Sequence, residues 1–175
     1  MNEKTDKMTV TALVDRIIVA ESNGDPDARN KRSSATGAAQ FLDGTWLEAV
    51  RRQRRDLIQG RSDKEVLDLR RDPGLAREIA ARLVEKYAAM LNKRGLPTTP
   101  GSLYLAYFAG SAGAVALLSG AENADAASLM AAADATGRTT REKLINANPF
   151  LKGLTVGEIK RWADHKMAGD SPGHL

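Results

Sequence analysis

Apolar residues recur at helical spacing along almost the whole chain, and we find no convincing run that alternates as a strand would. The first such segment carries apolar side chains three and four residues apart: Val10, Leu13, Val14, Ile17 and Ile18. This spacing predicts one buried face of an amphipathic helix, which the sequence Ser22-Asn23-Gly24 should end. Residues 23–36 are polar and rich in turn-forming types, so we predict a long loop there.

Helix start signals divide the rest of the chain into further predicted helices. Five starts are indicated by a capping residue, two of them with a proline directly after it: Asp43, Ser62, Asp72, Thr99 and Thr155. Ser62 and Thr155 are each followed three residues later by a glutamate, which is the capping-box pattern. Glycines at positions 95, 120 and 137 predict helix ends or breaks.

The pattern as a whole predicts one all-α domain. A length of 175 residues suits a single domain, and no internal repeat or long linker divides it. We place the domain at residues 9–168, with a flexible N-terminus at 1–8 and a frayed tail at 169–175. A long loop inside a compact helical domain is more often functional than not, which draws attention to residues 23–36.

Composition and charge narrow the possible chemistry. Lys and Arg number 26 against 22 Asp and Glu, so the net charge of +4 suits an anionic polymer but is too mild for a dedicated nucleic-acid binder. The chain has no Cys, and its two His, His165 and His174, lie in the C-terminal tail. We therefore expect no metal site and no cofactor, and chemistry that rests on carboxylates, hydroxyls and amides.

The N-terminus lacks the features of a Sec signal peptide. Residues 1–8 mix both charge signs, and no apolar stretch or cleavage-site pattern follows them. The longest weakly polar run, residues 109–121, is mostly Ala and Gly and falls short of the ~20 strongly apolar residues that a membrane span needs. We expect no membrane span and no Sec export.

Glu21 occupies an unusual position at the end of the first predicted helix. It lies four residues after Ile17 and three after Ile18, so the apolar stripe continues onto its side chain. Partial burial and the negative end of the helix dipole would both raise the pKa of this carboxyl, as a general acid requires. The alternative is a glutamate that turns to water or pairs with an arginine of the following loop.

Three motifs follow one another in a recognisable order. Glu21-Ser22 is followed by Pro26, Ala28 and Asn30, then by Ser34-Ala-Thr-Gly-Ala-Ala-Gln-Phe41 with Thr45-Trp46, and finally by Leu105-Ala-Tyr-Phe-Ala-Gly110. Over about residues 10–120 this order resembles the transglycosylase SLT domain, the goose-lysozyme-like lytic transglycosylases and muramidases that cut bacterial peptidoglycan. The resemblance implies a lysozyme-like helical fold with a substrate groove.

The resemblance also implies roles for single residues. Glu21 would be the single catalytic acid and base. Five residues would bind substrate: Ser34, Thr36, Gln40, Phe41 and Tyr107.

Each of these substrate-binding roles has a physical form. Ser34 would hydrogen-bond the Glu21 carboxylate or a sugar, Gln40 would bind an N-acetyl group or hydroxyls, and Tyr107 would offer an apolar wall and a hydroxyl. Gly37 with the two alanines after it would let the backbone approach the glycan closely. Ser34 and Thr36 could instead bond their own loop backbone.

The sequence departs from the common family pattern in three places. Many members have Asn where Phe108 stands, and Leu-Met where Ala38-Ala39 stands. The C-terminal Tyr-bearing motif is not evident, and residues 148–162 look instead like the ending of muramidase-like domains from phage and secretion-system proteins. We interpret Phe108 as a core aromatic, and the sub-type within the family stays open.

Two reactions fit the resemblance. In lytic transglycosylases one Glu protonates the leaving oxygen and then helps the muramyl C6 hydroxyl attack its own anomeric carbon, which gives a 1,6-anhydro product. A hydrolase needs a second carboxylate to orient water, and the nearby candidates are Asp25, Asp27 and Asp43. Their alternative roles are turn formation and helix capping.

Two rival functions remain to be weighed. The basic run Arg51–Arg55 invites a nucleic-acid hypothesis, but such runs are more often a solvated helix face, and we expect no nucleic-acid partner. A catalytically inactive peptidoglycan-binding or assembly module would keep the fold and lose the chemistry. In either wall-directed case the chain would act in the periplasm or cell wall, exported by a route other than Sec or released by a phage.

Overall fold

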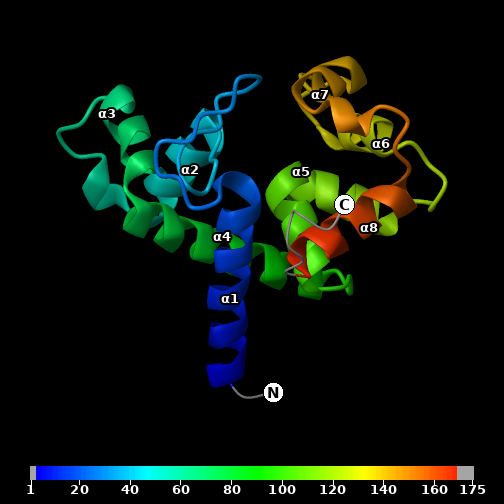
Figure 1. Ribbon diagram of the computed structural model, residues 1–175, viewed down its shortest axis with the longest axis horizontal. Coiled ribbons are helices and arrows are strands. Elements are labelled where there is room, and N and C mark those ends of the chain that lie inside the picture. The colour runs from blue at the N-terminus through cyan, green and yellow to red at the C-terminus, as the bar shows by residue number, and fades with distance from the viewer. Residues whose placement is uncertain (1–2, 169–175) are drawn as a thin grey trace. The chain divides into compact units, whose positions relative to one another are not determined.

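The structure is a computed structural model that describes residues 3–168. Helices joined by loops make up this part of the chain (Figure 1). These residues form eight α-helices and no β-strand: α1 (Glu3–Ser22), α2 (Asp43–Gln53), α3 (Asp63–Asp68), α4 (Pro73–Lys93), α5 (Pro100–Ser119), α6 (Ala126–Ala133), α7 (Arg141–Ala147) and α8 (Val156–Met167). Three short 3-10 helices join them: η1 (Arg55–Leu57), η2 (Leu69–Arg71) and η3 (Pro149–Leu151). The prediction of an all-α fold is confirmed, and the expected frayed tail, 169–175, lies outside the described residues.

The chain divides into two compact units, residues 1–85 and 86–175, and the division falls within α4. The single domain over residues 9–168 stays a prediction, and each of the two units has its own buried side chains. Glu21 and the loop that follows it belong to the N-terminal unit, and Tyr107 belongs to the C-terminal unit.

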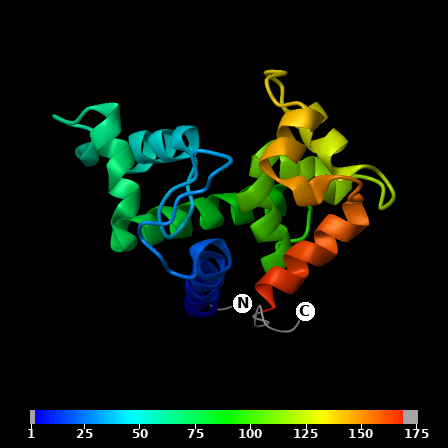
Figure 2. The same ribbon diagram turned by 45° about the horizontal axis from the view of Figure 1, so that its top comes forward.

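The N-terminal unit is organised around the end of α1. The predicted stripe is confirmed for Leu13, Val14, Ile17 and Ile18, which are buried, and Val10 at its start is half-buried. The helix begins at Glu3, so residues 3–8 of the expected flexible N-terminus are helical. The loop of residues 23–42 runs beside the end of α1 and next to α2 (Figures 1 and 2).

The C-terminal unit is organised around α5. Both α6 and α8 pack on α5, as the green, yellow and orange-red helices in Figure 2 show. Backbone hydrogen bonds hold the starts of α6 and α8 together, from Ala126 N to Leu154 O (2.9 Å) and from Val156 N to Ala124 O (2.9 Å). Gly110 has a non-helical backbone (φ 78°, ψ 172°) and divides α5 into two helical runs.

Most predicted helix starts are confirmed. Both capping boxes are present at Ser62 and Thr155, and Thr99 caps α5 ahead of its proline. Asp72 accepts a hydrogen bond from Leu75 N (3.1 Å) at the start of α4. The prediction for Asp43 is wrong: Asp43 is the first helical residue, and its carboxylate pairs with an arginine instead of capping α2.

Among residues 3–168, α5 is the one helix that is long and apolar enough to cross a membrane. This property rests on length and composition alone, and half of the apolar window is buried within the fold. Since the core helix of a folded domain passes the same test, α5 gives only weak support for a membrane span.

Candidate active site

Glu21 lies in the last turn of α1 and is half-buried. Ile17 and Ile18, one turn earlier, are buried in the core of the N-terminal unit. The predicted placement is therefore confirmed: a carboxyl side chain follows directly on an apolar stripe and is only partly open to water. Partial removal from water is the first requirement for a carboxyl group that must hold a proton near neutral pH.

Ser22 fixes the end of α1 to the loop. Its Oγ donates to the carbonyl oxygen of Ala38 at 2.7 Å, and it accepts a hydrogen bond from Gly24 N at 3.2 Å. Ala38 lies sixteen residues further along the chain, so this bond joins two of the three sequence motifs. The residue beside Glu21 thus holds the carboxyl-bearing turn in place against residues 34–41.

Gly37 lies against the backbone of η2. Its φ of +86° belongs to the left-handed region, and a Cβ placed on it would lie 2.2 Å from the carbonyl oxygen of Arg70. Gly37 N also donates to Ala28 O at 2.8 Å. The sequence predicts that Gly37 gives a glycan close access, but the close approach in the structure is to Arg70. Ala38 and Ala39, which follow it, are buried.

Gln40 turns its side chain back onto its own loop. Its Nε2 donates to Ala28 O at 3.1 Å and to Gly37 O at 2.9 Å, which uses both hydrogens of the amide. Gln40 is half-buried, and its Oε1 has no hydrogen-bond partner in the part of the chain that the structure describes. The sequence analysis expects Gln40 to donate to and accept from a sugar. In this structure its Oε1 remains available to accept a hydrogen bond, whereas both hydrogens of Nε2 are already used.

Thr36 and Phe41 are buried in this structure, and their expected role as sugar contacts stays a prediction. The Thr36 side chain is buried, and its Oγ1 donates to Ser34 O at 3.0 Å. This bond agrees with the alternative that Thr36 bonds the backbone of its own loop. Phe41 is 3% exposed, and its ring packs on Trp46 with 5.1 Å between ring centroids. Both side chains therefore stabilise the loop through contacts inside the fold.

Arg70 is the residue that sequence reasoning missed. Its side chain is buried, and Nη1 donates to Ser34 O (2.9 Å) and Phe41 O (3.0 Å) while Nε donates to Leu67 O (2.9 Å). Nη1 also lies 2.7 Å from Asp43 Oδ1. A buried cation with this set of partners holds both ends of the 34–43 segment. In the sequence Arg70 looks like one of two surface arginines before Asp72, and no local pattern marks it.

Most of the remaining polar candidates of the loop have structural partners. Ser34 Oγ accepts a hydrogen bond from Asp43 N at 3.0 Å, which ties it to the start of α2. Asp25 Oδ1 accepts from Asp27 N at 2.9 Å, as expected of a turn former. Asp27 is exposed. Of the three candidates for a second acid, Asp25 and Asp43 thus already have roles in holding the fold.

The C-terminal unit carries the third motif on α5. Tyr107 is half-buried, and the half-buried Phe108 packs against Trp162 and Phe150 with centroid distances of 5.2 and 5.9 Å. Tyr104 joins Trp162 from the buried side at 5.4 Å. Phe108 therefore packs in an aromatic cluster, but it is half-buried and not enclosed as the interpretation of a core aromatic expected, and Phe150 at the edge of the cluster is 42% exposed.

The resolved carboxylate pKa shifts in the C-terminal unit belong to helix caps, an ion pair and the turn after α6, where hydrogen bonds from Thr139 and Thr136 lower the pKa of Asp134. Hydrogen bonds from Arg141, and then from Ser128, lower the pKa of Asp125 to about 2. Hydrogen bonds from Thr155 lower the pKa of Glu158 in the capping box of α8. Among the described residues no three His, Cys, Asp or Glu side chains gather as metal ligands would.

Comparison with known protein families assigns the chain to a family. A family model of the transglycosylase SLT domain matches residues 2–131, well over half of the chain. The match defines a lysozyme-like, all-helical class of lytic-transglycosylase-type peptidoglycan glycosidases. The chain belongs to the transglycosylase SLT domain family. No curated protein matches it.

Proposed function

We propose that this protein cleaves the β-1,4 bond between N-acetylmuramic acid and N-acetylglucosamine in peptidoglycan, with Glu21 as the single general acid and base. The observation that carries the proposal is the position of Glu21, half-buried at the end of the apolar stripe of α1. Membership of the SLT family supports peptidoglycan as the substrate. The chain would then act where its substrate lies, in the periplasm or cell wall.

The reaction would need one proton and no water. Protonated Glu21 would donate to the glycosidic oxygen, the bond from that oxygen to C1 would break, and the resulting carboxylate would face the cation-like sugar. The C6 hydroxyl of the same muramyl residue would then attack C1 and return its proton to Glu21. The product would be a 1,6-anhydro sugar, and the acid would be ready for the next cycle.

The fates of the three candidate second acids support this one-carboxylate route over hydrolysis. Asp43 is paired with Arg70 through Oδ1, and Asp25 closes a turn through Oδ1, so each already makes a structural contact that a water-orienting role would add to. Asp27 is the remaining candidate for a hydrolase. Gln40 would take part in either route by accepting a hydrogen bond at Oε1 from a sugar hydroxyl or an acetamido N–H.

The test compares clearing of purified peptidoglycan by the wild type and by Glu21→Gln. Removing the acid should slow clearing by at least about 1,000-fold, the scale of general acid–base catalysis. The control is Glu85→Gln, an exposed glutamate on α4, which should clear as the wild type does. Equal clearing by wild type and Glu21→Gln would remove Glu21 from the mechanism. No clearing by any of the three proteins would favour the inactive wall-binding module.

Mass spectrometry of the released fragments separates the two reactions. Anhydro ends lack one water relative to reducing ends, and we expect anhydro ends. Asp27→Asn should leave their yield unchanged. Reducing ends that disappear in Asp27→Asn would instead establish a hydrolase with Asp27 as its second acid.

A further inference from the structure

Arg70 connects α3 to the loop that follows α1, through a side chain that is 8% exposed. Its Nε donates to Leu67 O at 2.9 Å, which fixes the plane of the guanidinium against the end of α3. Its Nη1 donates to Ser34 O at 2.9 Å and to Phe41 O at 3.0 Å. One planar group therefore holds both ends of the segment 34–41.

This segment is a closed turn, so a shift at its ends is passed to its middle. Thr36 N donates to Phe41 O at 3.2 Å, and Gln40 N donates to Gly37 O at 3.1 Å. Gly37 also lies against the backbone of Arg70, whose carbonyl oxygen leaves no room for a Cβ. The side chain and the backbone of Arg70 thus both contact the segment.

The middle of the segment is bound to α1 beside Glu21. Ala38 O accepts a hydrogen bond from Ser22 Oγ at 2.7 Å, and this hydroxyl also lies 3.3 Å from Ile18 O, one turn earlier. Glu21 directly precedes Ser22 in the last turn of α1. The contacts therefore lead from Arg70 through the segment to the turn that carries the carboxyl group.

The position of this turn matters for acid catalysis. A general acid must lie within hydrogen-bond reach of the oxygen that it protonates, and a displacement of about 1 Å can slow a reaction about 100-fold. Lysine in place of Arg70 would keep a positive charge near Asp43. It has a single nitrogen and no planar fork, so it cannot reproduce the hydrogen bonds to α3 and to the segment together.

We infer that Arg70 is a positioning residue for Glu21, and that it acts through the segment 34–41 and the hydrogen bond between Ser22 and Ala38. The inference rests on the proposed function for the role of Glu21 as the acid. The effect of Arg70 is on where the carboxyl group lies and not on the chemistry that this group performs.

The first experiment measures kcat and KM on soluble glycan strands, at a temperature where circular dichroism shows every variant to be folded. Arg70→Lys should lower kcat about 10-fold to 100-fold and change KM by less than about twofold. Arg71→Lys, at the exposed neighbouring position, should leave both constants unchanged. An unchanged kcat in folded Arg70→Lys would overturn the inference. A rise in KM alone would also overturn it, because the segment would then serve only substrate binding.

The second experiment tests the route with Ser22→Ala, which removes the hydroxyl that binds Ala38 O. This variant alone should lower kcat and leave KM unchanged. A wild-type kcat would overturn the inference, even if Arg70→Lys does not fold. In the double variant the two losses should not multiply, because each substitution breaks the same connection. Losses that multiply in full would mean that Arg70 and Ser22 act separately, and the inference would be wrong.

Amide hydrogen exchange tests the same contacts without a substrate. In Arg70→Lys the amides of Gly37 and Asn23, which both donate to backbone carbonyl oxygens in the N-terminal unit, should exchange faster. The amide of Leu96, which donates to a carbonyl oxygen in the C-terminal unit, should exchange as before. Unchanged exchange at Gly37 and Asn23 would overturn the inference. If wild type and Glu21→Gln cleave alike, the proposed function fails, and faster exchange would still show that Arg70 holds this turn.

Discussion

The two motif glycines, Gly37 in the N-terminal unit and Gly110 in the C-terminal unit, share a positive φ for different reasons. Both lie at positive φ, 86° and 78°. A Cβ on Gly37 would collide with the carbonyl oxygen of Arg70 at 2.2 Å, whereas a Cβ on Gly110 would meet nothing within 4 Å. Gly37 is therefore a point of close packing, and Gly110 is a bend with open space around it.

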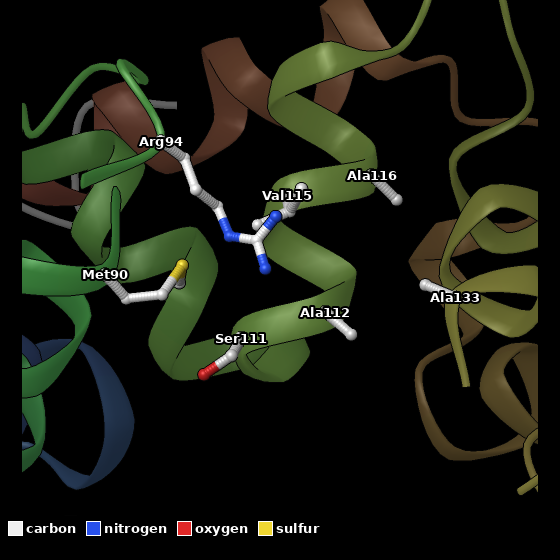
Figure 3. Close-up of a pocket in the computed structure, with 7 residues that line it drawn as sticks. All are labelled: Met90, Arg94, Ser111, Ala112, Val115, Ala116 and Ala133. Atoms are coloured by element: carbon white, nitrogen blue, oxygen red, sulfur yellow. The ribbon is translucent and has the colours of Figure 1, made fainter. Parts of the chain in front are cut away.

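This contrast extends to the segments around the two glycines. Residues 34–43 hold themselves by hydrogen bonds to Arg70 and within the loop, so most of their polar groups are already used. In residues 105–113, Leu105, Ala106 and Gly113 are buried, whereas residues 107–112 are half-buried or exposed. A pocket lined in part by Ser111 and Ala112 (Figure 3) begins just beyond Gly110. The motif of residues 34–41 thus builds a fixed support beside Glu21, and the motif of residues 105–110 ends at the bend of α5.

The largest effect should come from Gly37→Ala. Both the left-handed backbone and the contact with Arg70 O oppose a side chain there, so the free energy of unfolding should fall by at least about 3 kcal/mol. Urea unfolding followed by fluorescence measures this loss. The matched control is Gly24→Ala, at φ +82° with nothing within 4 Å, which should lose about 1 kcal/mol. Equal losses in the two variants would remove the close approach as the reason for Gly37.

Arg70→Met should come next, with a loss of about 3 kcal/mol in unfolding free energy. The change leaves the carbonyl oxygens of Ser34 and Phe41 and the Asp43 carboxylate without their cation. Arg71→Met, at the exposed neighbouring position, should change the unfolding free energy by less than about 0.5 kcal/mol. If the two variants unfold at the same urea concentration, the network around Arg70 does not stabilise the loop.

Gly110→Ala should cost less than Gly37→Ala, because only the backbone conformation opposes it. With φ 78° and ψ 172° the residue lies in a region that is essentially reserved for glycine, which sets the loss at about 2 kcal/mol. Thermal unfolding gives the measurement. A loss as large as that of Gly37→Ala would mean that side-chain space, and not only the bend, matters at this position.

The smallest expected effect is on the pH dependence of stability, through the ion pair of Asp125 with Arg141. The pKa of Asp125 is lowered to about 2, so its ionised form stabilises the fold at pH values above about 4, and this contribution is lost as the pH falls towards 2. Asp125→Asn keeps the cap on α6 but loses the ion pair, so it should be less stable by roughly 0.5 kcal/mol at pH 7. Unfolding midpoints of the two proteins should converge between pH 4 and pH 2. A difference that stays constant over this range would assign the effect to something other than the charge.

Much of the fold could be predicted because its signals are local. Each capping box lies within four residues, and the apolar stripe of α1 is visible from spacing alone. The same holds for the loop that follows Glu21. These features depend on residues that are neighbours in sequence, so they can be predicted from the sequence alone.

The parts of the site that prediction missed depend on distant partners. Asp43 has the appearance of a cap, but Arg70, 27 positions later, takes its carboxylate as an ion-pair partner. This pair has no local signal, because a buried arginine and an exposed one look the same in sequence. Phe41 packs on Trp46, which is close to it in sequence, and its role as a sugar contact stays a prediction.

The chain has two tryptophans, and one lies in each unit. Trp46 is fully enclosed and donates its indole N–H to Val66 O at 2.7 Å, whereas Trp162 is half-buried in the aromatic cluster. Their emission spectra should therefore differ in wavelength and in access to a quencher. Replacing either tryptophan by phenylalanine gives a protein whose tryptophan fluorescence reports on one unit alone. The order in which the two units unfold can then be measured directly.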